Sequence, residues 1–255
     1  MHHLILLLFF SLLTVTTTLT SPESHHLLLP SSRKLRQHDT LYCDSWRFTV
    51  ETNDAGSWST IPSICFDFVK DYVTGDRYFS DSKLVGGNSL EFANSINVSG
   101  DGKDAWIFDV DETLLFNLPY YQDHGFGSEV FDEKAFDEWM LLGEGIVLPA
   151  SLSLYKELQQ LGFTIFILTG RSESFRNATE TNLRNVGYDN WKKLILRGPD
   201  DKHKLAVDYK SERRKALEDG GYRIRGNFGD QWSDLVGYAI AQRSFKLPNP
   251  MYYIA

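Results

Sequence analysis

Residues 105–113 read AWIFDVDET, an apolar run that ends in two carboxylates and a hydroxyl. Side chains alternate along a strand, so Asp109 and Asp111 can lie on one side of it. Two carboxylates at close range repel each other, and one pKa rises unless a cation lies between them. The pattern indicates a hard-metal site, a nucleophile or an acid/base pair. A solvated turn after a strand explains the same residues, and this stretch alone does not decide between the two.

From this stretch onwards the chain alternates apolar runs with helical segments, which predicts βαβ units and a parallel sheet. Residues 163–168 are continuously apolar, as in a strand buried on both faces. We therefore expect an α/β fold with a Rossmann-like parallel sheet. The expected strands are 106–110, 163–168, 193–196, 222–227 and an edge strand at 251–254, and the expected helices are 149–161, 174–186 and 211–218.

Residues 117–146 interrupt the alternation with aromatic side chains set among acidic ones. We interpret this segment as a small, mostly helical cap insertion over the C-terminal end of the first strand. Tyr120, Tyr121 and Trp139 either form the core of the cap or contact the leaving group of a substrate.

The carboxyl ends of the other strands also carry polar groups. Ligands bind at these ends in an open parallel sheet. Thr169 and Gly170 follow the second strand, Lys210 lies where a helix opens, and Asp230 and Asp234 follow a later strand. Each group alone is typical of an ordinary turn or surface, but their combination at strand ends favours a functional site.

The length of 255 residues allows one domain with a small insertion. An apolar run near the N-terminus predicts a signal peptide over residues 1–20, too short to span a bilayer. Residues 21–40 are expected to be a flexible leader or propeptide. The domain then covers residues 41–255 and begins with a helical segment, with helices at 62–72 and 82–96.

The net charge of −8 argues against nucleic acid as a partner and offers no basic patch for an anionic membrane. The sequence leaves the oligomeric state open, with a homodimer among the options. The signal peptide predicts entry into the secretory pathway, with the vacuole or the extracellular cell wall as destination.

Two further features fit that compartment. Cys43 and Cys65 are the two cysteines of the chain, and an even count in an oxidising compartment favours a disulfide over two free thiols. Asn97 and Asn177 each begin an N-glycosylation sequon.

The order of these motifs, DxDxT at residues 109–113, a strand-terminal Thr169, Lys210 and GDxxxD at residues 229–234, resembles the haloacid dehalogenase-like (HAD) phosphatase superfamily. Within it, the chain resembles the plant acid phosphatase and vegetative storage protein family. Stretches 43–47 and 61–72 carry the family resemblance, together with residues 108–113 and 210–213.

The resemblance implies roles for the motif residues. Asp109 would be the nucleophile, and Asp111 would protonate the leaving group and then activate water. Thr169, the Gly170 N–H and Lys210 would bind the phosphoryl group. Magnesium would be held by Asp109, the backbone carbonyl of Asp111, Asp230 and, in support, Asp234.

We therefore expect an acid phosphatase that hydrolyses small-molecule phosphate monoesters through an aspartyl-phosphate, with magnesium. The alternative from the same family is a vegetative storage protein with incidental phosphatase activity. Some storage members lack the nucleophilic aspartate, whereas this chain keeps Asp109. A phospho-accepting signalling domain also uses Asp, Thr and Lys around magnesium, but Asp111 and the late carboxylate pair count against it.

Overall fold

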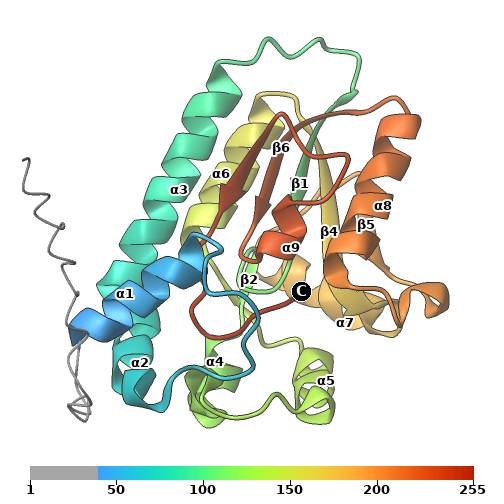
Figure 1. The fold of residues 1–255 in the computed structure, drawn as a ribbon. Helices are drawn as coiled ribbons and strands as arrows, with labels where there is room; N and C mark the ends of the chain where they lie inside the picture. The colour runs from blue at the N-terminus through green and yellow to red at the C-terminus, as the bar shows by residue number, and fades with distance from the viewer. Residues whose placement is uncertain (1–39) are drawn as a thin grey trace, which may run out of the picture. The chain divides into compact units, whose positions relative to one another are not determined.

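The computed structural model describes residues 40–255 and shows a five-stranded parallel sheet, as expected (Figure 1). The strand order is β5-β4-β1-β6-β7, so β1 is central and β4 and β6 flank it. This order brings the C-terminal ends of β1, β4 and β6 together at one edge of the sheet. The strands are β1 (Asp104–Phe108), β4 (Thr164–Ser172), β5 (Lys193–Arg197), β6 (Arg223–Gly229) and β7 (Arg243–Lys246).

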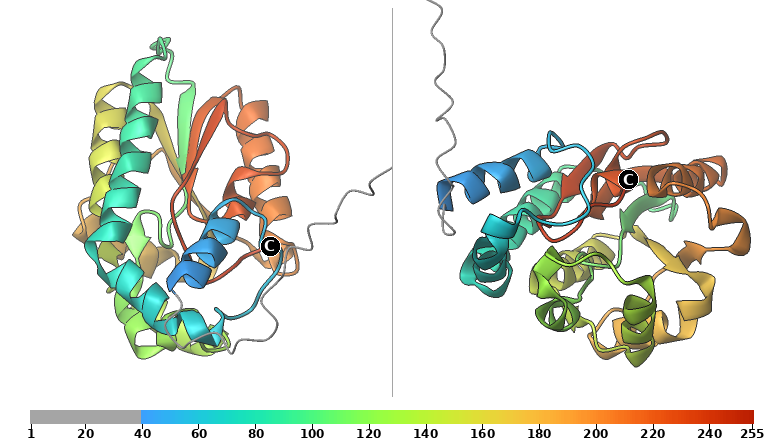
Figure 2. Two further views of the ribbon diagram at one scale, coloured as in Figure 1. Left: turned by 60° about the vertical axis from the view of Figure 1, so that its left-hand side comes forward. Right: turned by 60° about the horizontal axis from the view of Figure 1, so that its bottom comes forward.

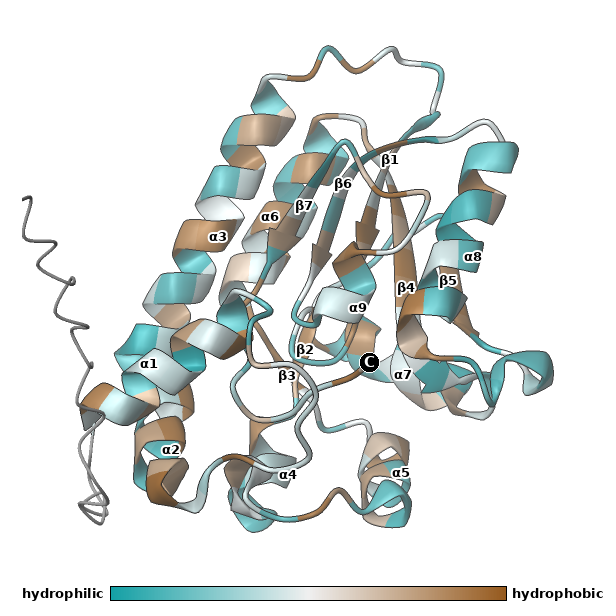
Figure 3. Cartoon of the chain, in the orientation of Figure 1, coloured by the Kyte–Doolittle hydropathy of each residue, from teal (hydrophilic) through white to brown (hydrophobic). Residues whose placement is uncertain are grey.

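Helices cover both faces of the sheet, which is why the strands β1 and β4 are apolar on both sides (Figure 3). Trp106 and Phe108 belong to the core that α3 and α6 help to enclose, whereas Ala105 and Ile107 belong to the core beneath α8. This alternation along β1 follows the two-residue period of a strand. The helices are α3 (Asp76–Asn94), α6 (Pro149–Gln160) and α8 (Ala206–Asp219).

The segment before β1 is helical, as expected, although its boundaries differ from the prediction. Helix α1 (Thr40–Glu51) was not predicted, and α3 begins six residues before the expected start at residue 82. Cys43 in α1 and Cys65 form a disulfide with a Cα–Cα distance of 5.4 Å. The disulfide ties α1 to the 3-10 turn η1 (Ser63–Cys65) that leads into α2 (Phe66–Thr74).

The predicted cap is a compact insertion closed by a short antiparallel pair, β2 (Leu115–Phe116) and β3 (Ile146–Val147). It lies at the C-terminal ends of the strands (Figures 1 and 2). Tyr120 and Tyr121 are each only 5% exposed and pack near Phe136, so they belong mainly to the core of the cap. Its helical elements are α4 (Leu118–Asp123), η2 (Gly125–Gly127) and α5 (Glu133–Leu142).

The C-terminal part of the chain differs most from expectation. The edge strand expected at residues 251–254 is wrong: the edge strand is β7, and residues 251–254 form no strand. Asn249 and Tyr252 instead reach carboxylates at the C-terminal ends of β1 and β6. Helix α8 also begins at residue 206 rather than 211, which places Lys210 inside it. The remaining helical elements are η3 (Glu173–Phe175), α7 (Arg176–Asn185), η4 (Pro199–Asp201) and α9 (Trp232–Leu235).

Among the helices of residues 40–255, none is long and apolar enough to cross a membrane. The predicted signal peptide and all but the last residue of the predicted leader lie outside the described residues.

Candidate functional site

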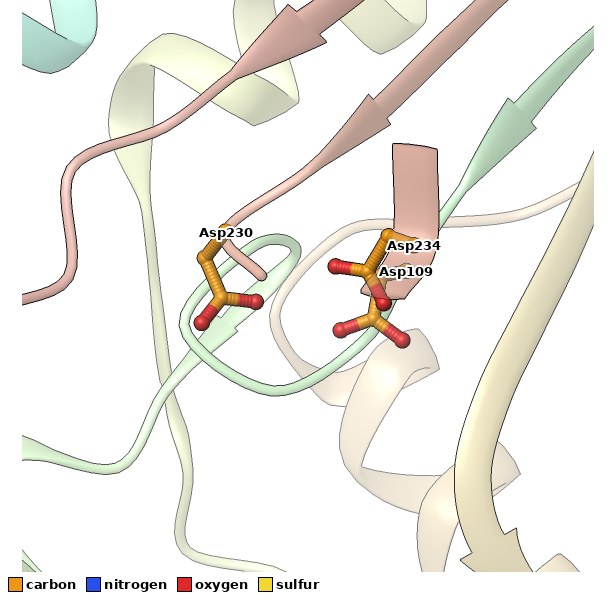
Figure 4. A group of neighbouring side chains, drawn as sticks. All are labelled: Asp109, Asp230 and Asp234. Atoms are coloured by element: carbon orange, nitrogen blue, oxygen red, sulfur yellow. The ribbon is translucent and has the colours of Figure 1, made fainter. Parts of the chain in front are cut away.

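Three buried carboxylates, those of Asp109, Asp230 and Asp234, meet at the C-terminal ends of β1 and β6 (Figure 4). One oxygen from each lies within 4.8 Å of the others. Asp109 directly follows β1, Asp230 directly follows β6, and Asp234 lies in α9. Because β1 and β6 pair in parallel, with Phe108 opposite Phe228, residues far apart in the sequence converge here.

A lysine from α8 partly neutralises this cluster. Lys210 Nζ donates to Asp109 Oδ1 at 2.6 Å and also to Asp234 Oδ1. One ammonium group faces three carboxylates, so the cluster keeps an excess of negative charge. An all-oxygen donor set with that excess fits a hard divalent cation.

The pKa directions express the same excess of charge. Burial raises the pKa of Asp109 well above its usual range, whereas Lys210 lowers it and the neighbouring carboxylates raise it again. Burial, followed by the charge of Asp234, raises the pKa of Asp230 to about 6. A bound cation would favour the charged form of both carboxylates.

Neighbouring polar groups orient the carboxylates that follow β6. Asp230 accepts hydrogen bonds from Thr113 Oγ1 at 3.2 Å, Gln231 Nε2 at 2.8 Å and Asn249 Nδ2 at 2.7 Å. Asp234 Oδ2 accepts from the backbone N–H of Gln231 at 2.9 Å. These bonds fix the rotamers of both side chains, which a metal site requires of its ligands.

Gly229 allows Asp234 to reach this position. A Cβ atom at residue 229 would lie 2.7 Å from the Cβ of Asp234 and closer still to its carboxylate. Real Cβ atoms essentially never approach another atom so closely. A glycine at the end of β6 is therefore required by the close approach of the Asp234 side chain.

Asp111 is oriented separately from the three carboxylates. Its carboxylate forms an ion pair with Arg171, with Nη2 of the arginine 2.6 Å from Oδ1. Asn117 Nδ2 donates to the same oxygen at 2.8 Å. Although burial disfavours its charge, Arg171 and these hydrogen bonds lower the pKa of Asp111.

The groups expected to bind phosphate lie at the same edge of the sheet. Pairing of Phe108 with Ile167 places the end of β4 beside Asp109. Thr169 is buried there, and its Oγ1 accepts a hydrogen bond from the backbone N–H of Arg171 at 3.1 Å. Gly170 is exposed, and a Cβ atom there would meet no other atom within 4 Å. Its backbone is therefore open to a ligand.

Several polar residues of the site were not singled out from the sequence. Glu112 is fully buried with φ of +49° and accepts hydrogen bonds from the Asn117 N–H and the Tyr252 hydroxyl. Asn249, which donates a hydrogen bond to Asp230, is buried and stands between two prolines. The proline pair was the one signal in the sequence that could have drawn attention to it.

Both predicted sequons begin with an exposed asparagine. Asn97 lies in the loop before β1, and Asn177 lies in the first turn of α7. Thr179 of the second sequon is buried, and its hydroxyl accepts a hydrogen bond from Arg171. Glycosylation at either position stays a prediction.

Comparison with known proteins identifies the family. Residues 31–255 match the model of the acid phosphatases, subfamily IIIB of the HAD superfamily. The chain is 55% identical over 216 residues to Acid phosphatase 1 of Solanum lycopersicum, covering 85% of each chain. It is 42% identical to Vegetative storage protein 2 of Arabidopsis thaliana, covering 83% of this chain and 80% of that protein.

The fold has a solved counterpart in the class C acid phosphatase of Bacillus anthracis, with a TM-score of 0.61 at 23% identity. The match covers 72% of this chain and 83% of the bacterial one, and it bears on the fold alone. The family match and the relatives confirm the resemblance drawn from the motifs. The chain belongs to subfamily IIIB of the HAD superfamily, the acid phosphatases.

Proposed function

We propose that the protein hydrolyses small-molecule phosphate monoesters through a phosphorylated Asp109. The observation that carries this proposal is the separation of two carboxylates that are two residues apart. Asp109 lies against Lys210 within the carboxylate cluster, whereas Asp111 is paired with Arg171 and is not one of the three clustered carboxylates. One carboxylate can therefore attack phosphorus while the other handles protons.

In the first step, an oxygen of Asp109 attacks phosphorus and the bond from phosphorus to the ester oxygen breaks. The Thr169 hydroxyl, the Gly170 N–H and Lys210 bind the non-bridging phosphoryl oxygens and stabilise their charge in the transition state. The leaving oxygen takes a proton from Asp111.

In the second step, Asp111 takes a proton from a water molecule as that water attacks phosphorus. The bond between phosphorus and Asp109 breaks, and inorganic phosphate leaves. Asp111 thereby returns to its protonated form for the next cycle, so one residue serves as acid and then as base.

We propose Mg²⁺ as the cation of the carboxylate cluster. Its ligands would be Asp109, the backbone carbonyl of Asp111 and Asp230, with Asp234 in support. When bound, it offsets the repulsion between Asp109 and an anionic substrate. Thr113, Gln231 and Asn249 would act through the orientation of Asp230.

The test is hydrolysis of p-nitrophenyl phosphate by wild type and Asp109→Asn, with and without a chelator. We expect Asp109→Asn to lower kcat by about a thousandfold or more, because the amide is a poor nucleophile. Asp208→Asn, which changes an exposed carboxylate on the helix of Lys210, should retain wild-type rates. Equal rates for wild type and Asp109→Asn would refute the mechanism, and full activity in chelator would refute the metal.

We also propose that the protein resides in the secretory pathway, in the vacuole or the cell wall. The disulfide between Cys43 and Cys65 supports an oxidising compartment. Treatment of the plant-expressed protein with an N-glycosidase should lower its mass, and a variant lacking Asn97 and Asn177 should show no such change. An unchanged wild-type mass would count against passage through the glycosylating compartments.

A further inference from the structure

Arg171 makes its main contacts with Asp111 from a buried position. Its side chain is 3% exposed. Its Nε lies 3.2 and 3.1 Å from the two carboxylate oxygens of Asp111, and its Nη2 lies 2.6 Å from Oδ1. Its Nη1 donates to Thr179 Oγ1 at 3.1 Å, which anchors the guanidinium to α7. The orientation of the guanidinium group is therefore fixed by Asp111 on one side and by Thr179 on the other.

The hydrogen bonds fall unequally on the two oxygens of Asp111. Oδ1 accepts from Arg171 Nη2 at 2.6 Å and from Asn117 Nδ2 at 2.8 Å, whereas within residues 40–255 Oδ2 accepts only the shared Nε donor. A carboxylate oxygen that already accepts two strong hydrogen bonds has little capacity left for a proton. Oδ2 is therefore the oxygen available for proton transfer.

The cap fixes the second donor of this arrangement. Trp139 in α5 donates through Nε1 to Asn117 Oδ1 at 3.0 Å. With its oxygen bound to the tryptophan, the Asn117 amide must direct its NH₂ group towards Asp111. The cap helix α5 is thereby connected to Asp111 through one side chain.

We propose that Arg171 is a positioning residue for the reaction, which together with Asn117 holds Oδ1 of Asp111 and presents Oδ2 to the leaving group. This inference rests on the proposed phosphatase function. The proton moves from Oδ2 to the ester oxygen as the bond from that oxygen to phosphorus breaks. In the second step Oδ2 takes a proton from water as the bond between phosphorus and Asp109 breaks.

The test compares two leaving groups in wild type and Arg171→Lys. Lysine keeps the positive charge but cannot make the two-pronged contact with a carboxylate. The quantity to measure is kcat/KM, because it covers the transfer to Asp109 and excludes hydrolysis of the phosphorylated enzyme. The substrates are p-nitrophenyl phosphate, whose stable nitrophenolate leaves without protonation, and glycerol 2-phosphate, whose alkoxide requires a proton.

We expect Arg171→Lys to lower kcat/KM for glycerol 2-phosphate at least about tenfold more than for p-nitrophenyl phosphate, since general acid catalysis contributes about a hundredfold or more. Inhibition by inorganic phosphate should change less than about twofold, because the proposed phosphate donors are Thr169, Gly170 and Lys210. If Arg171 had a merely structural role, the substitution would lower kcat/KM equally for both substrates and would also weaken the binding of inorganic phosphate.

The matched control is Arg176→Lys, which changes an arginine of the same segment that is paired with Glu173 and Glu180. It should leave both values of kcat/KM within about twofold of wild type. If Arg171→Lys does not fold, Trp139→Phe is used in its place, because it removes the hydrogen-bond donor to Asn117 while keeping an aromatic ring at this position. We expect Trp139→Phe also to lower kcat/KM more for glycerol 2-phosphate than for p-nitrophenyl phosphate, but by a smaller factor than Arg171→Lys.

An equal loss for both substrates, or no loss, in the folded variant overturns the inference. The outcome is distinct from failure of the proposed function, in which wild type itself would hydrolyse neither ester.

Discussion

Substituting Gly229 by alanine tests whether the carboxylate cluster depends on one close approach of the backbone. The new Cβ atom would lie 2.7 Å from the Cβ of Asp234, whereas ordinary contacts begin at 3.4 Å. Asp234 must therefore move by about 0.7 Å to restore an ordinary contact, the difference between these two distances. It cannot do so without disturbing its bonds to Lys210 and to the Gln231 N–H.

The loss of stability in Gly229→Ala can be estimated from the forced displacement of Asp234 and from the loss of its hydrogen bonds. Inserting a methyl group into a packed site costs about 1–3 kcal/mol. Loss of a hydrogen bond to a charged group costs about 1.5–3 kcal/mol. The cost of the methyl group and the cost of the lost hydrogen bond are not additive, because both arise from the displacement of Asp234. We expect Gly229→Ala to lower the free energy of unfolding by about 3 kcal/mol, and hence Tm by about 6–12 °C. Displacement of Asp234 should also weaken activation by Mg²⁺ about ten- to a hundredfold.

The assay combines thermal unfolding with a magnesium titration of p-nitrophenyl phosphate hydrolysis. Gly87→Ala in α3 is the control, because a Cβ atom there would meet nothing within 4 Å. Alanine should stabilise the interior of that helix by about 0.5–1 kcal/mol and leave the titration unchanged. If Gly229→Ala retains the wild-type Tm and magnesium dependence, the site does not depend on the close approach of Asp234 to residue 229.

Three further changes test other features. Replacing Asn249 by alanine removes a donor to Asp230, and the apparent magnesium affinity should fall at least about tenfold in the same titration; unchanged affinity would contradict an orienting role. Replacing Cys43 and Cys65 together by alanine opens a loop that spans 22 positions in the sequence, so the free energy of unfolding should fall by about 3 kcal/mol. A denaturant titration measures the change, and an unfolding midpoint equal to that of wild type would contradict the expected loss. Asp104, 1% exposed, has its pKa lowered, chiefly by its hydrogen bond with Arg223. The contribution of Asp104 to the free energy of unfolding is therefore fully present above the pKa of about 3.9 that the residue has in the unfolded chain. It is lost as the pH falls towards the lower pKa of the folded state. Asp104→Asn should destabilise the protein at pH 7, and the difference from wild type should shrink below about pH 4; a constant difference would refute the linkage.

The sequence predicted the sheet and the cluster because their signals are local. An apolar run followed by Asp109, or by Asp230, marks both a buried strand and a polar strand end. Parallel pairing then brings those ends together whatever the length of the chain between them. The four core strands and the cap therefore followed from pattern alone.

The sequence did not predict the contacts that depend on tertiary packing. Arg171 follows Gly170 in a segment that reads as an ordinary turn, and nothing local indicates that its side chain pairs with Asp111. Strand β7 carries two charged residues and one apolar residue over Arg243–Lys246, which is a weak strand pattern. The apolar residues at 251–254 gave a stronger pattern, but Met251 is buried near the cap rather than in the sheet.

The contacts made by Asn249 and Tyr252 also have a consequence during protein synthesis. The ribosome makes the chain from its N-terminus, so β1, the cap, β4 and β6 are all complete before these two residues exist. Until they have left the ribosome, Asp230 lacks the donor from Asn249 and Glu112 lacks the hydroxyl donor from Tyr252. A nascent chain can thus assemble the sheet while Asp230 and Glu112 stay incompletely oriented, until Asn249 and Tyr252 have been synthesised and make their contacts.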